Sequence, residues 1–243
     1  MGAAVASLAR DDGGASLTGE AKARLVRRMF DRIVPGYDLM NRLMTGGMDG
    51  RWRKVAAGQA LPQGQRVLDI ATGTGDLAAE LHRQGASVTA ADFAANMLRV
   101  AQRKLPAAVP LVLADAQDLP FAAASFDRVT NAFLLRNLSD LDRALQEMRR
   151  VLRPHGLLVC LEITRPAPGW FARLFGFYFY RLVPALGGAI TGQRTAYRYL
   201  PNSLTTFPRA AELAHHLRRA GFGEVQYRLL AFGTVAIHIG SVT

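Results

Sequence analysis

From Arg66 onward, short apolar runs rich in strand-forming residues alternate with stretches whose apolar residues have helical spacing. Such an alternation predicts a parallel β-sheet covered by helices on both faces. Helices are predicted between the runs, one opening near Asp76, one passing through Met97, and one over residues 141–152 that Pro154 ends. The predicted strands are residues 66–71, 87–92, 110–115, 126–133 and 155–163.

The C-terminal part of the chain predicts how this sheet closes. A helix near residues 208–219 is followed by two strand-like runs joined by a short turn at Gly233, and such a hairpin makes the last strand antiparallel. The predicted fold is a seven-stranded, mostly parallel sheet in a Rossmann-like α/β arrangement. At 243 residues the chain suits one domain of this kind. We expect a flexible tail over residues 1–20 and a single domain over residues 21–243.

Two segments stand outside the alternation, residues 21–60 before the first strand and residues 166–207 after the fifth. In open α/β sheets, ligands bind beyond the carboxyl ends of the strands, so additions at that edge shape the pocket. We therefore expect the first segment to be a helical cover and the second to be an insertion that covers the substrate.

Composition narrows the range of partners. The net charge is +11, but the arginines are scattered without a basic cluster interleaved with aromatic residues, so no nucleic-acid partner is expected. The five histidines and the single cysteine, Cys160, lack metal-ligand spacing, so no metal is expected. No apolar run is long enough to span a bilayer and the N-terminus does not resemble a secretory signal, which predicts a cytoplasmic protein. The oligomeric state stays open, with a homodimer as one alternative.

A glycine-containing turn, DIATGTGD over residues 69–76, follows the first predicted strand. Glycines let the backbone turn sharply and approach a ligand closely, with the amides of a helix N-terminus behind them. Gly73 and Gly75 also satisfy the dinucleotide fingerprint, and Asp92 ends the second strand, where a ribose-binding acid would lie. On the glycine motif alone, a nicotinamide-dependent oxidoreductase is the alternative enzyme class.

Charge separates these two cofactors. A dinucleotide brings a pyrophosphate of about two negative charges to the turn, where Asp69 and Asp76 would repel it. S-adenosylmethionine carries an ammonium and a sulfonium against one carboxylate, so acids near the turn attract it. We therefore predict S-adenosylmethionine as the cofactor. Its amino group is expected near Asp69, its backbone contacts along residues 73–75, its ribose hydroxyls at Asp92 and its adenine at Asp115.

Five separated segments carry a family resemblance. VLDIATGTGDLAAEL has the form of a cofactor motif, with Ala71 where many methyltransferases have glycine. FDRIVPGYDLMNRLMTGGMDGRWRK has the form of an N-terminal signature, with Asp49 where that signature commonly has histidine. The others are FLLRNLSD, RVLRPHGLLVCLEITRP and YRYLPNSLTTFP. Together they resemble the UbiE/MenG/COQ5-type quinone C-methyltransferases over almost all of the chain from the N-terminal signature onward.

The resemblance implies the class I S-adenosylmethionine methyltransferase fold. It also implies methyl transfer to a ring carbon of a polyprenyl hydroquinone, from demethylmenaquinol to menaquinol or in the equivalent step towards ubiquinone. Carried over by motif, the cofactor-binding residues are Thr74, Asp92, Asp115 and Ala116. Asn131 is a further cofactor-binding candidate, in a segment that departs from the family pattern because Asn131-Ala132 replaces a serine that the family sometimes has.

Ring-carbon methylation requires the protein to position the quinol and to stabilise the oxyanion formed when the quinol loses a proton. Because arginine stays protonated, we expect Arg136 to stabilise the oxyanion and Tyr37, Asp38 or a water to act as the base. Structural roles remain open for these residues, including an Arg136–Asp140 ion pair. The candidates for binding the substrate are Asn41, Asn137 and Tyr199.

Residues 169–190 are rich in aromatic side chains and are broken by Arg173 and Arg181. Two interpretations stay open. The segment is a helix packed on its own domain, or it is an apolar wall for the isoprenoid tail that touches the membrane where such a substrate lies. The second interpretation predicts a protein peripheral to the inner face of the membrane.

Overall fold

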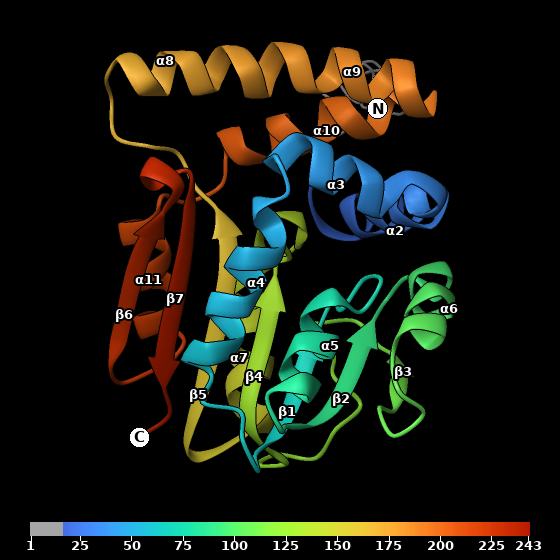
Figure 1. The fold of residues 1–243 in the computed structure, drawn as a ribbon. Helices are drawn as coiled ribbons and strands as arrows, with labels where there is room; N and C mark the ends of the chain where they lie inside the picture. Colours follow the sequence, from blue (N-terminus) through green and yellow to red (C-terminus); the bar gives the residue numbers. More distant parts are fainter. Residues whose placement is uncertain (1–16) are drawn as a thin grey trace.

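The computed structural model describes residues 17–243, in which a seven-stranded sheet lies between layers of helices (Figure 1). The strand order is β3-β2-β1-β4-β5-β7-β6. Only β7 is antiparallel to its neighbours, so the predicted mostly parallel sheet with an antiparallel last strand is confirmed. The strands are β1 (Arg66–Ile70), β2 (Ser87–Asp92), β3 (Leu111–Leu113), β4 (Phe126–Ala132), β5 (Leu152–Ile163), β6 (Val225–Leu230) and β7 (Val235–Ser241).

Helices cover both faces of this sheet, as the alternation predicts. On one face α5 packs on β1 and β2, and α4 packs on α5 and β5, while on the other face α7 packs on β5 and α11 packs on β6 and β7. The side chain of Asp140 caps α7 by accepting a hydrogen bond from the backbone N–H of Arg143 at 3.0 Å. The helices are α4 (Met48–Gln59), α5 (Asp76–Arg83), α6 (Ala95–Lys104), α7 (Leu141–Val151) and α11 (Ala210–Arg219).

Two predicted elements have wrong boundaries: β3 spans Leu111–Leu113 instead of residues 110–115, and the junction of α7 and β5 is displaced. The helix expected to continue to Leu152 ends at Val151, and β5 begins at Leu152 instead of His155. The reason is sheet pairing: Leu152 lies opposite Phe126 of β4, across a register shift that precedes the regular pairing of the two strands. Pro154 therefore lies inside the irregular start of a strand, where its missing N–H costs little.

Additional helices lie over the carboxyl ends of the parallel strands (Figure 1). Residues 21–60 contribute most of α2 (Gly19–Ile33), then η1 (Val34–Gly36), α3 (Tyr37–Thr45) and α4. Residues 166–207 contribute α8 (Trp170–Phe177), the π-helical turn η3 (Tyr178–Leu182), α9 (Val183–Thr191) and α10 (Arg194–Thr205). The predicted tail over 1–20 falls mostly outside the described residues, and α2 already begins at Gly19.

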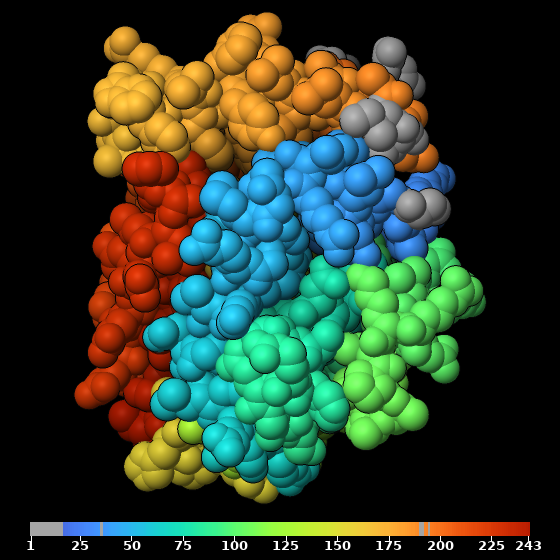
Figure 2. All heavy atoms as spheres, in the orientation of Figure 1, coloured from blue at the N-terminus to red at the C-terminus, as the bar shows by residue number. Residues whose placement is uncertain are grey.

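The helix formed by α8, η3 and α9 runs along one whole end of the molecule (Figure 2), and α10, α2 and α3 lie between it and the sheet (Figure 1). Within residues 17–243, no helix is both long and apolar enough to cross a membrane. The cover is therefore a layer on the sheet edge where the strands present their carboxyl ends, and it encloses the candidate site.

Candidate active site

Three adjoining cavities lie between the sheet edge and the cover. The large cavity, with about 700 Å³ of empty space including its mouth, follows the ends of β2 and β3. The turn cavity lies over the glycine-containing turn after β1. The cover cavity lies below η3, between α3, α4 and the end of β5. Tyr37 lines all three, so a single side chain joins them.

Asp92 ends β2 and lines the large cavity. Its carboxylate is 4% exposed and accepts hydrogen bonds from the backbone N–H groups of Gly73 and Ala94, each at 2.8 Å. Burial raises the pKa of Asp92 to about 6, against the lowering effect of these amides. The carboxylate is fixed in position but has no cationic partner among its described hydrogen bonds.

Asp69 lies in β1 below the turn and lines the turn cavity. Its two oxygens accept hydrogen bonds from the hydroxyls of Thr72 at 2.7 Å and Thr130 at 2.9 Å. Burial raises the pKa of Asp69 to about 7, with hydroxyl hydrogen bonds opposing the shift. A carboxyl group in this state gains most from a nearby cation, which would favour its ionised form.

The turn between β1 and α5 uses its small residues in different ways. Ala71 and Gly73 have positive φ values of 54° and 58° and line both the large and the turn cavity. Gly75 also has a positive φ, 91°, but it lines neither cavity, and a Cβ there would lie 3.0 Å from Leu105. The glycine at this position is therefore explained by backbone conformation and by packing rather than by approach to a ligand.

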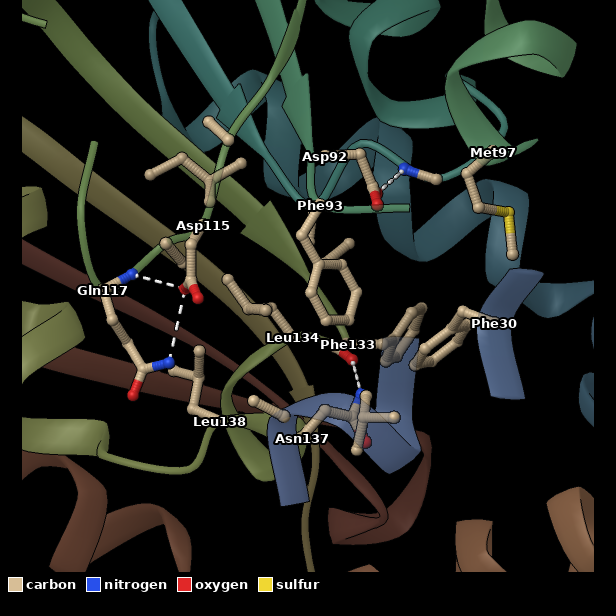
Figure 3. Close-up of a pocket in the computed structure, with 18 of the residues that line it drawn as sticks. Phe30, Asp92, Phe93, Met97, Asp115, Gln117, Phe133, Leu134, Asn137 and Leu138 are labelled. Atoms are coloured by element: carbon tan, nitrogen blue, oxygen red, sulfur yellow. Dashed lines mark hydrogen bonds between the residues drawn. The ribbon is translucent and has the colours of Figure 1, made fainter. Parts of the chain in front are cut away.

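Asp115, Ala116 and Gln117 form the far side of the large cavity after β3 (Figure 3). Asp115 is exposed at the rim and accepts a hydrogen bond from the backbone N–H of Gln117 at 2.9 Å. An apolar wall lies on the opposite side of the large cavity from Asp115. Sequence reasoning did not predict this wall, although one of its residues, Phe93, directly follows the predicted site residue Asp92. This wall is formed by side chains from α2, α6 and the β2 and β4 loops: Phe30, Phe93, Met97, Leu134 and Leu138.

Asn131 does not line any of the three cavities, although it was expected at the cofactor. Its side-chain amide lies 3.2 Å from the sulfur of Cys160 and 3.8 Å from that of Met148, on the α7 side of the sheet. The neighbouring Thr130 contacts Asp69 instead. Successive side chains of a strand point to opposite faces, so Asn131 lies on the face away from Asp69, and Thr130 itself lines none of the three cavities.

Thr74 and Asp38 form a polar contact at the mouth of the turn. Thr74 lines the turn cavity and its hydroxyl donates to Asp38 at 2.7 Å. Asp38 also binds Lys104 at 2.5 Å and lines none of the three cavities. Burial alone would raise the pKa of Asp38, but the hydrogen bonds from Lys104 and Thr74 hold it below its ordinary value. Asp38 is therefore poorly suited to the predicted role of base.

Arg136 follows β4, in η2 (Leu135–Asn137), and lines the cover cavity. Its guanidinium pairs with Glu162 of β5, and both side chains are almost fully buried, 6% and 1% exposed. The alternative pairing with Asp140 is wrong, because Asp140 caps α7. The Nε of Arg136 is buried without a described partner, so the guanidinium retains an unused donor.

The remaining candidates separate into two groups. Tyr37 and Asn41 line the cover cavity and share a side-chain hydrogen bond, while burial raises the pKa of Tyr37. Asn137 lines the large cavity, donates to the carbonyl of Phe133 at 3.0 Å and has a buried Oδ1 without a described partner. Tyr199, in contrast, is fully buried in α10 among the side chains of α2 and lines none of the three cavities.

The groups around the large and turn cavities fit S-adenosylmethionine. Two buried carboxyls, Asp69 and Asp92, have raised pKa values that a cationic ligand would lower again. The apolar wall suits a flat aromatic base, and Asn137, whose buried amide oxygen has no described partner, lines the same cavity. A dinucleotide would bring its negatively charged pyrophosphate towards the buried Asp69, and this would make ionisation of Asp69 still more costly.

Comparisons with known proteins agree with this chemistry. A model of the ubiE/COQ5 methyltransferase family matches residues 17–242. A demethylmenaquinone methyltransferase of Thermus thermophilus is 49% identical over 218 residues, covering 87% of this chain and 99% of the relative. A ubiquinone/menaquinone biosynthesis C-methyltransferase UbiE of Desulfotalea psychrophila is 44% identical over 88% of this chain and 89% of the relative. A solved SAM-dependent methyltransferase of Thermotoga maritima aligns with TM-score 0.68 and 19% identity, covering 90% and 100% of the two chains.

The fold, the cavity and these relatives define an S-adenosylmethionine-dependent methyltransferase. Within this class, the chain belongs to the ubiE/COQ5 methyltransferase family. The dinucleotide-dependent oxidoreductase that the glycine motif left open is thereby set aside.

Proposed function

We propose that the protein transfers the methyl group of S-adenosylmethionine to a ring carbon of demethylmenaquinol, a polyprenyl hydroquinone. The observation that carries this proposal is the buried Arg136–Glu162 pair in the wall of the cover cavity, which adjoins the large cavity through Tyr37 and Phe133. Relatives with 49% and 43% identity bear the name demethylmenaquinone methyltransferase, which supports the substrate class. The related ubiquinone precursor is the alternative substrate.

Bound S-adenosylmethionine would supply an electrophilic methyl group. The task of the protein is to hold the quinol ring beside it and to stabilise the negative charge on the ring oxygen while a proton leaves. Arg136 can perform the second task from the cover cavity, since its charge is permanent and its geometry is fixed by Glu162. Tyr37 has a raised pKa and therefore stays protonated, so it acts as a hydrogen-bond donor or proton relay.

A charge-neutral double substitution tests Arg136. Arg136→Gln together with Glu162→Gln removes both charges and leaves no unpaired ion in the interior. We expect turnover of demethylmenaquinol, followed by mass spectrometry, to fall about a hundredfold, as when one oxyanion donor is lost, with unchanged affinity for S-adenosylmethionine. Glu162→Gln alone is the control. A folded double variant with wild-type turnover would contradict the assignment, and wild-type turnover of only the ubiquinone precursor would contradict the substrate.

We further propose that the long helix formed by α8, η3 and α9, over residues 170–191, contacts the membrane surface. Its outward side carries a stripe of exposed apolar side chains, while Phe179 points inward and lines the cover cavity. The exposed Arg173 and Arg181 on the same helix would favour anionic headgroups. The stripe consists of Trp170 (77% exposed), Leu174 (56%), Phe177 (59%), Leu182 (40%) and Leu186 (54%).

Vesicle flotation tests this contact. Trp170→Ser with Phe177→Ser should abolish co-flotation with anionic vesicles that contain quinol, because the double change removes the two largest exposed side chains of the stripe. Leu113→Ser, a change of an apolar side chain on β3 that is 53% exposed, is the control. Wild-type protein that never co-floats would refute the proposal. A homodimer stays a prediction, which analytical ultracentrifugation would check.

A further inference from the structure

A second buried arginine, Arg53 of α4, lies in the wall between two of the cavities. It is 7% exposed and lines both the turn cavity and the cover cavity. Its Nη1 donates to Asp49 at 2.6 Å, and Asp49 in turn accepts a hydrogen bond from the hydroxyl of Thr45 at 3.1 Å. Neither Arg53 nor Asp49 was among the candidates that sequence reasoning selected for the site.

The guanidinium of Arg53 is oriented by more than its ion pair. It stacks over the ring of Phe133, with 5.2 Å between its central carbon and the ring centroid. Its charge acts on Tyr37 and on Asp69, and it lowers the pKa of each against the larger effect of burial. Arg53 is therefore a fixed cation near the one buried carboxyl that lines the turn cavity.

The turn cavity thus presents a cation and a carboxyl group on its wall, Arg53 and Asp69. This combination is complementary to an α-amino acid zwitterion, in which an ammonium and a carboxylate are bonded to the same carbon. Asp49 takes one of the five N–H donors of the guanidinium, so the planar group retains donors for a second carboxylate. The methionine part of S-adenosylmethionine has these two charged groups.

We infer that Arg53 binds the carboxylate of the methionine moiety of S-adenosylmethionine, and that Asp49 positions it. This inference rests on the cofactor assigned above and does not depend on which quinol is methylated. When Asp69 is ionised, Asp49, Arg53 and Asp69 together carry one net negative charge, which matches the net positive charge of S-adenosylmethionine, while Asp76, the other acid of the turn cavity, is paired with Lys104. The Asp49–Arg53 pair therefore places a cation beside the ligand carboxylate without making the site as a whole repel the sulfonium.

The position of Arg53 offers one competing role. Because Arg53 also lines the cover cavity, it could serve the oxyanion of the methyl acceptor instead of the carboxylate of the methyl donor. The two roles differ in which ligand loses affinity when Arg53 is changed, so a comparison of two ligands that differ only in the carboxylate separates them.

Isothermal titration calorimetry with S-adenosylhomocysteine and its decarboxylated analogue tests the inference without any turnover. Wild-type protein should bind S-adenosylhomocysteine ten- to a hundredfold more tightly than the analogue, the range for a charge-assisted hydrogen bond. Arg53→Gln should remove this preference by weakening only the binding of S-adenosylhomocysteine. Arg51→Gln, an exposed arginine of the same helix, is the matched control and should keep the preference.

A second variant covers the case in which Arg53→Gln fails to fold because Asp49 is left unpaired. Arg53→Gln with Asp49→Asn removes both charges of the pair and should give the same loss of preference. Asp49→Asn alone should reduce the preference partly, because Arg53 remains but is no longer held. Retention of the full preference in a folded variant without Arg53 would overturn the inference, and so would equal weakening of both ligands.

Two further outcomes distinguish a failure of the role assigned to Arg53 from a failure of the proposed function. If the ligand preference persists in Arg53→Gln while the KM for quinol rises, Arg53 serves the acceptor and the inference is wrong. If wild-type protein shows the preference and loses it with Arg53→Gln but methylates no quinol, the proposed function fails and the role of Arg53 stands.

Discussion

The two sides of the site hold their buried charges differently. On the sheet side, Asp69 and Asp92 are held by hydroxyls and backbone amides, and no described hydrogen bond joins either to a cation. On the cover side, Arg53 and Arg136 each have a buried carboxylate partner, and the two guanidinium groups lie on Phe133 at 5.2 and 5.9 Å from its centroid.

This difference indicates which side is complete before ligand arrives. The cover cations are already neutralised, so their pairs contribute to the folded structure and remain in place. The sheet-side carboxyls have raised pKa values and remain costly to ionise until a cation is bound. Substitutions of the Arg136–Glu162 pair should therefore act mainly on stability and turnover, whereas substitutions of Asp69 and Asp92, and of Arg53 where it lines the turn cavity, should act mainly on cofactor affinity.

The largest expected effect is on the Arg136–Glu162 pair. Arg136→Ala should lower the free energy of unfolding by about 3–5 kcal/mol, because it leaves Glu162 buried without a counter-charge. Urea denaturation measures this loss, and the double variant Arg136→Ala/Glu162→Ala should lose less than the sum of the single losses. Lys104→Ala, which breaks a partly exposed contact, should cost about 1 kcal/mol or less. Equal losses of unfolding free energy for Arg136→Ala and Lys104→Ala would show that the buried pair contributes no more than the partly exposed one.

The next effect concerns Asp69 and pH. Its pKa is about 7 in the folded chain and near 3.8 in the unfolded chain, so the folded protein binds the extra proton between these values. Asp69 therefore costs nothing below about pH 4, and its cost grows as pH rises to about 7. Relative to wild type, Asp69→Asn should gain on the order of 3 kcal/mol between pH 4 and pH 8. Denaturant titrations at several pH values measure this difference, and a constant difference would contradict the raised pKa.

A smaller effect is expected at Asp92. Asp92→Ala should weaken S-adenosylmethionine binding by roughly 1.5–3 kcal/mol, the scale for hydrogen bonds to a charged group, in a protein that still folds. Asp118→Ala, a change of an exposed acid beyond β3, should leave the affinity unchanged. Calorimetry on both variants decides the matter. An unchanged affinity in folded Asp92→Ala would show that the buried carboxylate serves only the Gly73 and Ala94 amides.

The smallest effect is expected at Ala71, whose φ of 54° is unfavourable for a residue with a side chain. Ala71→Gly relieves this strain but adds freedom to the unfolded chain, so we expect a net change within about 1 kcal/mol. Thermal denaturation of the two proteins side by side provides the measurement. A loss greater than this would mean that the methyl group of Ala71 contributes packing that outweighs the strain.

The end of β2 at Asp92 could be predicted, because the apolar run stops there. The end of β3 could be predicted only approximately: the strand stops at Leu113, two residues before the predicted end, and Asp115 follows it in the loop. The face of a central strand could not be predicted. Both faces of β4 are buried, so its pattern carries no sign that Thr130 and not Asn131 points towards Asp69.

The ion-pair partners of the buried charged residues could not be predicted from the sequence either. Glu162 lies 26 residues from Arg136, and their pairing depends on the registry of β4 and β5 and on the path of the loop after β4. Asp49 was noticed only as a departure from a familiar motif, although its spacing to Arg53 is that of neighbours on one helix face. That spacing is common on solvated helices, and only the packing of α4 shows that the pair is buried.

The position of Tyr37 at the junction of all three cavities has a thermodynamic consequence. Any shift of this one ring on occupation of one cavity would change the shape of the other two. Cooperativity is reciprocal, so the factor by which the methyl donor alters the affinity for the acceptor equals the factor in the opposite direction. In a protein with such a shared wall, binding of one ligand would change the dissociation constant of the ligand in the adjoining cavity.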